Sequence, residues 1–419
     1  MKLVFGKDKF SPYNEVIWDD QKVMNGHMML VGGSGTGKTY TIRKIISEIS
    51  KQNPNAVFHI IDIHGDIDVE GAETVEFAEN SQNGIPLLEI SPDIQYGGVR
   101  KKIRNIISTI NRTSRQIGTK QEATFINILT DLYAANGLYT NQPSSWTNYK
   151  RMPNVVDLRR FMEYKYKQML LGSTSECLNA LEDLNKSFQS LDKKIKKNYN
   201  VTKEDKEDLT KQKQKCKDIF NKFIETAETG KELDDFIKYD NKDVVKSLLD
   251  RVTSLESTGL FKSSFHVFKK NIRRYDVKTL NKDEQKMFVD LLLEKIFFEA
   301  KKRGEKRDGS IDTYIILDEA HNFITEEAEH IVNIISKEAR KFGISQILAS
   351  QTFTHFNEDI IANSSTKIIL GIDAMFHEGC ARKLNIDKKR FNYIIPHKSL
   401  MIQIKNKGDL SNRFYDVMI

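Results

Sequence analysis

The chain contains little cysteine, proline or tryptophan, and it has no long apolar run. Its 419 residues include 3 cysteines, 7 prolines and 2 tryptophans. Cys177, Cys216 and Cys380 lie far apart and none forms a CxxC pair, which argues against both disulfides and a zinc site. No apolar run approaches the ~20 residues needed to span a bilayer, and the charged start of the chain does not resemble a signal peptide. We therefore expect a cytoplasmic protein with no membrane insertion.

The overall charge says little about partners. The formal net charge is +7, from 65 Lys and Arg against 58 Asp and Glu, which is a mild preference for anionic partners. Local basic clusters are more informative, although each alone is more often a solvated face; they lie at residues 100–104, 269–274, 301–307 and 387–390. Several such clusters on one molecule fit a track for a phosphate backbone better than any single one does.

One glycine-rich stretch organises the chain. Residues 28–31 are apolar, as in a buried strand; GGSGTGKT follows at 32–39, and isoleucines then recur at helical spacing from Ile42 to Ile49. Strand, glycine loop and helix in this order are the context of a phosphate-binding P-loop. Glycines let backbone N–H groups surround an anion, and the helix N-terminus adds partial positive charge. The residues expected to bind a nucleotide are Gly32, Gly33, Ser34, Gly35, Thr36, Gly37, Lys38, Thr39 and Tyr40.

A second polar group follows the apolar strand at 314–317. Asp318 and Glu319 stand at its C-terminal end, and the carboxyl ends of strands in an open α/β sheet face the ligand. Lys38 would then contact the β- and γ-phosphates, while Thr39 and Asp318 would hold Mg²⁺. Glu319 would act as the general base on the attacking water. This combination favours hydrolysis over phosphoryl transfer to a metabolite.

Two further residues are candidates by position. Gln351 follows the strand at 344–350, where its amide could contact the γ-phosphate or the water, although a polar strand cap explains it equally well. Arg340 lies in the last turn expected for a helix at about 325–341, where a cation complements the helix dipole. From the pattern alone, the dipole is the better explanation of Arg340.

Strands that alternate with helices predict a mostly parallel, doubly wound α/β sheet. Beyond the strands above and a strand-like lead-in before residue 26, we expect strands at 56–62, 85–90, 272–277 and 367–372, and a closing hairpin from 400–405 and 413–419. A helical region is expected at about 98–136, and an amphipathic helix carries Met287, Leu291 and Ile296.

A charged helical insertion interrupts this pattern. Residues 141–257 are mainly helical and rich in Lys, Glu, Asp and Leu, and a break at 198–200 predicts a helical hairpin. We expect a core formed by 1–140 and 258–419, with 141–257 inserted between its two parts. The insertion is either a partner-binding arm or a solvated spacer.

Several motifs together resemble the HerA/FtsK superfamily of P-loop ATPases. They are GGSGTGKT at 32–39, IDIHGD at 61–66, LDEAHNF at 317–323 and KEARKFGISQILASQT at 337–352, followed by 363–370. A DxHG[DE] strand end combined with ARK[FY]G…[ST]Q is far more discriminating than a P-loop alone. The resemblance covers about 27–110 and 255–405, and it is greatest to HerA-type DNA translocases and the related conjugation ATPases.

This resemblance implies a RecA-like (ASCE) P-loop fold that uses ATP and Mg²⁺. It also implies a homo-hexameric ring whose pore passes double-stranded DNA. By the same likeness Asp318 is the Walker B residue, Glu319 the catalytic base and Gln351 the sensor of the γ-phosphate. Arg340 matches the place from which a neighbouring subunit supplies an arginine finger, which raises it above the dipole explanation. The roles of Asp62, His64 and Asp66 stay open.

The chain also departs from the family. The P-loop begins at Gly32, so we expect neither an N-terminal β-barrel nor a membrane segment before it, and Ile63 replaces the proline common in the DPHG form. The missing barrel puts in doubt the family's usual way of docking a nuclease, and the insertion could serve as the docking platform instead.

The expected function is an ATP-driven DNA translocase or helicase motor. It would act with a separately encoded nuclease or other effector in DNA processing, conjugation or antiviral defence. One alternative is a conjugation or secretion motor, which would have membrane-associated partners and weak stimulation by duplex DNA. Another is a nucleotide-gated assembly scaffold, whose hydrolysis would be slow and indifferent to DNA. An ABC transporter ATPase is disfavoured because no LSGGQ-like segment occurs.

Overall fold

Two compact units make up the chain. One comprises Met1–Leu87 with Thr258–Ile419, and the other is Leu88–Ser257. The computed structural model describes residues 1–95, 97–113, 116–171, 175–197, 203–226, 238–239, 242–263, 265–327, 330–409 and 411–419. Within these residues, no helix has both the length and the apolar character that crossing a bilayer requires.

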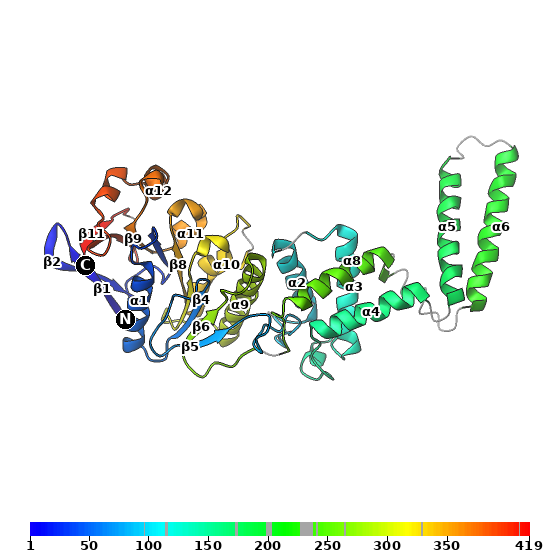
Figure 1. Ribbon diagram of the computed structural model, residues 1–419, viewed down its shortest axis with the longest axis horizontal. Coiled ribbons are helices and arrows are strands. Elements are labelled where there is room, and N and C mark those ends of the chain that lie inside the picture. Colours follow the sequence, from blue (N-terminus) through cyan, green and yellow to red (C-terminus); the bar gives the residue numbers. More distant parts are fainter. Residues whose placement is uncertain are drawn as a thin grey trace. The chain divides into compact units, whose positions relative to one another are not determined.

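The first unit is built on an 11-stranded sheet of order β2-β1-β11-β10-β9-β3-β8-β7-β4-β6-β5 (Figure 1). Every ladder from β9 through to β5 in this order is parallel, and the ladders that join β2, β1, β11, β10 and β9 are antiparallel. The strands are β1 (Lys2–Asp8), β2 (Ser11–Asp19), β3 (Met28–Gly32), β4 (Val57–Asp62), β5 (Glu73–Glu76), β6 (Ile272–Asp276), β7 (Thr313–Leu317), β8 (Ile344–Ser350), β9 (Thr366–Gly371), β10 (Ser399–Ile404) and β11 (Tyr415–Met418). The predicted mostly parallel sheet and its closing hairpin are confirmed.

One predicted strand is wrong. Residues 85–90 form turns and irregular chain, and the edge of the sheet is β5, which pairs in parallel with β6. Ile85, Leu87, Leu88 and Ile90 are nevertheless buried. The apolar pattern of this segment therefore reflects burial of its side chains and not pairing with another strand. Pro86 has no N–H group, so it cannot donate a hydrogen bond to a neighbouring strand.

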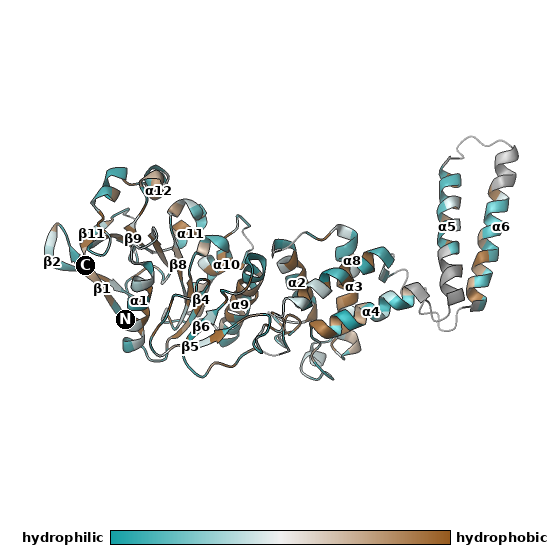
Figure 2. Ribbon diagram, viewed as in Figure 1, coloured by the Kyte–Doolittle hydropathy of each residue, from teal (hydrophilic) through white to brown (hydrophobic). Residues whose placement is uncertain are grey.

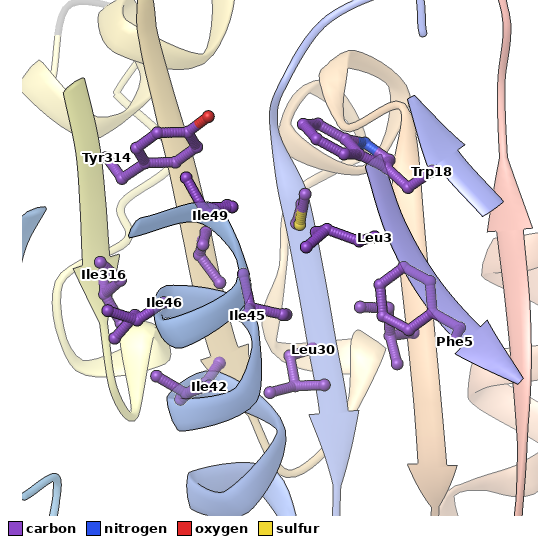
Figure 3. Close-up of a cluster of buried hydrophobic side chains, with 14 of the residues drawn as sticks. Leu3, Phe5, Trp18, Leu30, Ile42, Ile45, Ile46, Ile49, Tyr314 and Ile316 are labelled. Atoms are coloured by element: carbon purple, nitrogen blue, oxygen red, sulfur yellow. The ribbon is translucent and has the colours of Figure 1, made fainter. Parts of the chain in front are cut away.

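Helix α1 (Lys38–Gln52) covers one face of the central strands with an isoleucine stripe. Its buried residues are Ile42, Ile45, Ile46 and Ile49. They belong to a core cluster with Leu30 of β3 and with Tyr314 and Ile316 of β7 (Figure 3). Alternate strand residues such as Met29 and Leu317 are equally buried, so both faces of these strands are covered. Each fully buried isoleucine contributes about 1.5–3 kcal/mol relative to an exposed one.

The remaining helices of this unit are α9 (Lys282–Arg303), α10 (Ile331–Glu338), α11 (Glu358–Asn363) and α12 (His377–Leu384), with short 3₁₀ turns that include η2 (Ala320–Asn322), η3 (Ala339–Phe342) and η4 (Phe353–His355). The helix expected at about 325–341 is therefore shorter than predicted. The His330 side chain caps the start of α10 by accepting from the N–H of Val332, and Gly343, at φ 72°, ends η3. Arg340 consequently lies in a 3₁₀ turn and not in the last turn of an α-helix. Residues 328–329 lie outside the described part.

The second unit contains helices and connecting loops, and no strand, in the part that the structure describes. Its elements are α2 (Val99–Thr113), α3 (Thr119–Ala135), η1 (Pro143–Trp146), α4 (Val155–Leu171), α5 (Ser175–Lys197), α6 (Lys203–Thr226) and α8 (Lys242–Ser257). Helix α3 packs on α2, α4 and α8, so α2 and α3 belong with the later helices. In this division the helical unit spans Leu88–Ser257 and includes α2 and α3, whereas the sequence pattern suggested an insertion at 141–257; the domain boundaries stay a prediction.

Helices α5 and α6 pack on one another (Figure 1). The Ser187 hydroxyl of α5 lies 3.1 Å from the Cys216 thiol of α6, and the Gln212 amide donates to the Ser187 carbonyl. Figure 2 shows both helices as mainly hydrophilic, in keeping with their lysine-rich sequences. The predicted break at 198–200 lies outside the described residues.

Candidate nucleotide site

The P-loop joins β3 to α1 and leaves the start of the helix open to a ligand. Gly37 is the N-cap of α1, with φ 97° and ψ 20°, and no side chain caps the helix. A β-carbon is disfavoured at this φ, so glycine is required here. Lys38 Nζ donates to the carbonyls of Gly32 and Gly33, at 2.9 and 3.3 Å, which holds the ammonium over the loop. Uncapped N–H groups, the helix dipole and this ammonium together favour a phosphate.

A cavity of about 470 Å³ lies over the loop. Its lining is Gly33, Ser34, Gly35, Gly37, Lys38, Thr39, Tyr40, His64, Asp66, Asp318, Glu319, Gln351 and His397. The strands β3, β8, β7 and β4 are neighbours in the parallel part of the sheet, so their C-terminal ends meet at one edge. This explains why residues from distant parts of the sequence meet there. Of the predicted P-loop residues, Gly32 ends β3 and Thr36 lines a neighbouring cavity.

The acidic pair lies in the least solvated part of this cavity. Asp318 is 6% exposed and Glu319 is 8% exposed. The pKa of Asp318 is raised to about 6, with burial as the largest cause; the negative charges of Glu319 and Asp66 also raise it, and the positive charge of Lys38 lowers it. Two acids with different surroundings are the usual arrangement where one binds a cation and the other moves a proton.

Glu319 has a strained backbone and an unsatisfied oxygen. Its φ of 43° and ψ of 46° place it in the left-handed region, which costs on the order of 1–3 kcal/mol for a residue with a β-carbon. Its buried Oε2 lies 3.2 Å from His321 Nδ1 but makes no hydrogen bond there. A carboxylate oxygen held without a donor is available to accept a proton or a hydrogen bond from a ligand.

Two histidines and a serine form a cluster next to Glu319. The rings of His321 and His355 are 4.6 Å apart between centroids, and Ser350 Oγ lies 3.4 and 3.2 Å from their Nδ1 atoms. Burial lowers the pKa of His355, with the charge of His321 adding to the effect. Ser350 ends β8 beside Gln351, so this cluster links the turn that carries Glu319 to the strand end that carries Gln351.

The structure gives different places to the two acids and the histidine whose roles stayed open. Asp62 is fully buried and holds the turn after β4. Its Oδ1 accepts from the N–H of Gly65 at 2.7 Å, its Oδ2 accepts from the N–H of Ile67 at 2.9 Å, and Arg274 pairs with Oδ2 at 2.8 Å. His64 and Asp66, on that turn, line the cavity. Asp62 therefore has a structural role: it stabilises the turn from which His64 and Asp66 reach the cavity.

Sequence reasoning missed His397. It lines the cavity and its Nε2 lies 2.8 Å from the carbonyl oxygen of Gly35, although it belongs to the loop before β10. Its φ of 64° is again left-handed. Of the described non-glycine residues, three have a positive φ, and two of these three, Glu319 and His397, line this cavity. No sequence motif marks His397, since its position depends on a contact across 362 residues.

Arg340 does not line this cavity. Its 3₁₀ turn, η3, leads into the start of β8, and Gln351 follows the end of that strand. The 7 residues of β8 separate the two ends by roughly 20 Å at about 3.3 Å per residue. Consistently, Arg340 helps to lower the pKa of His27, a buried residue just before β3, although burial is the larger cause. The exposed Arg340 thus lies near the N-terminal end of β8, whereas the cavity lies at the C-terminal ends of the strands.

Comparisons with known proteins agree with this geometry. Residues 20–73 match the family model of the type IV secretion-system coupling protein DNA-binding domain. The chain is 29% identical to the DNA double-strand break repair helicase HerA of Pyrococcus furiosus over a stretch that covers 23% of each protein. Its structure resembles VirB4 of Thermoanaerobacter pseudethanolicus with a TM-score of 0.67 and 13% identity, covering 100% of this chain and 96% of that one. The resemblance to conjugation-related HerA/FtsK-type P-loop ATPases is confirmed.

A second structural neighbour supports the P-loop ATPase fold. The plasmid coupling protein TrwB, solved with ADP and Mg²⁺, has a TM-score of 0.52 and 10% identity, covering 94% of this chain and 84% of that one. Because the match to HerA spans less than a quarter of either protein, it does not extend to the whole of that relative.

The residues of this P-loop site fit a Mg²⁺ ion beside a nucleotide. Asp66, Asp318 and Thr39 line one cavity, and the Thr39 hydroxyl donates to Asp66 at 3.5 Å. Mg²⁺ prefers oxygen ligands and is usually held by one or two carboxylates together with water and substrate phosphates. The donor set therefore needs no further protein ligand.

We expect Asp318→Asn to stabilise the protein when no nucleotide or metal is bound. The folded protein holds the Asp318 proton more tightly than the unfolded chain, because the pKa rises from 3.8 to about 6. The ionised carboxylate thus costs stability at pH above about 6, and that cost disappears as the pH falls below about 4. The substitution should add on the order of 1–3 kcal/mol to the unfolding free energy at pH 8, and less at pH 5. Urea denaturation in EDTA at both pH values measures this.

The matched control is Asp68→Asn, because the Asp68 side chain is 84% exposed. It should change the unfolding free energy by about 0.5 kcal/mol or less. A loss of stability in Asp318→Asn at pH 8 would contradict the prediction and would mean that the carboxylate is held by structural hydrogen bonds.

Proposed function

We propose that this protein is an ATP-hydrolysing, HerA-like motor that translocates DNA in the cytoplasm. The observation that carries the proposal is the single cavity that brings together the open N-terminus of α1, the acidic pair Asp318 and Glu319, and Gln351. A P-loop is enough to bind a nucleotide. Hydrolysis also needs acidic groups that hold the metal ion and accept a proton from water, and the buried acid pair opposite the loop can supply both.

Each role follows from the position of the residue. The N–H groups at the start of α1 and Lys38 bind the β- and γ-phosphates, and Tyr40 borders them. Thr39 and Asp318 hold Mg²⁺, which when bound neutralises charge on the phosphate oxygens. Glu319 accepts the proton of the attacking water through Oε2, which makes no hydrogen bond within the protein. Gln351 orients the water or the γ-phosphate from the end of β8.

DNA as the polymer is supported by the matched domain model and by HerA, and not by the basic clusters. Cations in several of these clusters form internal ion pairs, among them Arg274 with Asp62, Lys306 with Asp312, and Arg390 with Asp416. Such pairs weaken the case for a phosphate track on these faces. The DNA-binding domain model matches residues 20–73, which include the P-loop itself.

We expect linear duplex DNA to stimulate ATP hydrolysis severalfold. Contacts to a DNA backbone release counterions, so the stimulation should fall steeply between about 50 and 200 mM salt. The assay measures phosphate release against increasing duplex DNA at both salt concentrations, with Glu319→Gln as the blank. Single-stranded DNA at the same nucleotide concentration is the control for unspecific polyanion effects.

A second candidate function is a conjugation or secretion motor. The observation that favours it is the match of residues 20–73 to the family model of the type IV secretion-system coupling protein DNA-binding domain. Hydrolysis that is measurable but indifferent to duplex DNA would favour this motor or a nucleotide-gated scaffold over a DNA translocase. We also propose that the protein assembles as a homo-hexamer and that a nuclease or other effector docks on Leu88–Ser257. Deletion of that unit tests the docking.

A further inference from the structure

A separate cavity of about 420 Å³ lies at the other end of the strands from the nucleotide cavity. Its lining is Val57, His59, Arg273, Ile296, Glu299, Lys302, Arg303 and Thr313. Val57 begins β4 and Thr313 begins β7, so this cavity lies near the N-terminal ends of these strands, whereas the nucleotide cavity lies at their C-terminal ends. Of the described residues, none lines both cavities. The proposed function assigns no role to this space.

The register of the sheet brings the strand residues of this cavity onto one face. His59 of β4 lies beside Arg273 of β6, and Val57 of β4 lies beside Thr313 of β7. Side chains alternate along a strand, so the next residue of β6, Arg274, points to the other face of the sheet. Helix α9 supplies the other wall of the cavity from its last two turns. Arg273 is therefore the arginine of β6 that faces α9.

The lining of this cavity has an excess of positive charge. Its charged residues are three cations and one carboxylate, Arg273, Lys302, Arg303 and Glu299. Glu299 pairs with Lys295 of its own helix at 3.5 Å. Among the described residues, no acid pairs with Arg273 or Lys302. Arg303 lies 3.9 Å from Asp312, an acid that Lys306 approaches more closely, at 2.6 Å. The three cations are thus largely available to an anion.

Local structure explains two of these cations but not Arg273. Lys302 and Arg303 stand in the last turn of α9, where cations complement the helix dipole. Arg273 comes from a strand, and it is held by its surroundings: its Nε donates to the carbonyl of Lys270 at 3.3 Å, and its guanidinium lies 5.6 Å from the centroid of the Phe268 ring. These contacts fix the position of the guanidinium without neutralising its charge.

His59 adds a buried polar group to the same cavity. It is 5% exposed, and its Nδ1 lies 2.8 Å from the hydroxyl oxygen of Tyr275. The pKa of His59 is lowered to about 3, with burial as the largest cause, and the charges of Arg273 and Arg303 also lower it. The imidazole is therefore neutral, and its Nε2 makes no hydrogen bond among the described residues. With Tyr275 donating to Nδ1, Nε2 carries the proton and can donate to a ligand in the cavity.

We propose that this cavity is a second anion site, which binds an oligophosphate away from the P-loop; the inference goes beyond the proposed function and does not rest on it. Its donors come from three elements, β4, β6 and α9. A tetrahedral phosphate has oxygens in several directions and can meet all three, whereas a carboxylate has two oxygens in one plane. The guanidinium forks of Arg273 and Arg303 suit phosphate oxygens, and three cations match the charge of more than one phosphate group.

The site is tested by calorimetry with tripolyphosphate in EDTA, on the full chain carrying Lys38→Ala so that the P-loop lacks its ammonium. We expect this protein to bind one tripolyphosphate per chain. Adding Arg273→Gln should weaken that binding at least about tenfold, because a charge-assisted bidentate contact is lost. Adding Arg307→Gln instead is the matched control: Arg307 is exposed in the same basic stretch but does not line the cavity, so the affinity should stay within about twofold.

Absence of tripolyphosphate binding, or an equal loss in the Arg273→Gln and Arg307→Gln proteins, would overturn the inference. Lys302→Gln changes an exposed side chain of the lining, so it keeps the test decisive if Arg273→Gln does not fold; it is held to the same comparison with Arg307→Gln.

Competition experiments identify the source of the phosphate. Displacement of tripolyphosphate by a short duplex DNA would assign the site to phosphates of a nucleic acid backbone, and a lack of displacement would assign it to a free oligophosphate. Citrate carries a comparable charge on carboxylates. Competition by citrate as strong as that by tripolyphosphate itself would overturn the assignment to phosphate.

Discussion

Replacing Glu319 with glutamine is expected to leave ATP binding intact and to lower turnover by about 10²–10⁴-fold. Glutamine keeps the shape of the side chain but cannot accept a proton from water. The fold should tolerate the change, because Oε2 of Glu319 makes no hydrogen bond that an amide would lose. Removing the Glu319 charge also removes one cause of the raised Asp318 pKa, so Mg²⁺ binding should not weaken. ATP affinity and single-turnover hydrolysis measure the two effects separately.

The matched control for this variant is Glu358→Gln. Glu358 is exposed in the first turn of α11, so its replacement should leave hydrolysis unchanged. Wild-type turnover in Glu319→Gln would show that another group takes the proton. His64, which lines the same cavity, would then be the next candidate base.

The parts of the site that sequence analysis predicted are those encoded by short, contiguous motifs. The P-loop needs its glycines, Lys38 and Thr39 side by side, and the acid pair needs an apolar strand before it. Each requirement is local, so residues 28–39 and 314–319 could be interpreted without knowing what lies opposite them. The parallel sheet then brings the two together, as the alternation of strands and helices predicted.

The parts that sequence analysis missed depend on distant contacts. His397 lines the cavity through a contact with Gly35, and no spacing rule connects these residues. Asp62 looked like a member of the site, yet its two backbone hydrogen bonds and its ion pair with Arg274 make it a support for the turn. The strand expected at 85–90 is wrong for a related reason, because an apolar pattern shows that a segment is buried and does not identify its partner.

The placement of Arg340 leads to the second large prediction. Arg340→Ala should leave nucleotide binding nearly intact and lower ATP turnover by about 10³–10⁵-fold, the usual contribution of an arginine finger. The cavity of its own chain is built without Arg340, and β8 lies between the two. If Arg340 acts on a nucleotide, that nucleotide is therefore expected to belong to a neighbouring subunit. Lys341→Ala, which removes the adjacent exposed cation, is the control and should retain hydrolysis.

Mixing two inactive variants tests whether Arg340 acts across a subunit boundary. Lys38→Ala lacks the phosphate contact but keeps Arg340, and Arg340→Ala keeps Lys38. In a ring with head-to-tail contacts, an equal random mixture restores roughly a quarter of the interfaces, because each needs Lys38 from one subunit and Arg340 from the next. Hydrolysis should therefore reappear on mixing and subunit exchange. If Arg340 acted within its own chain, no subunit in the mixture would hold both residues and no activity would return. Normal turnover in the Arg340→Ala variant alone would show that this arginine has no part in hydrolysis and is only a surface cation before β8.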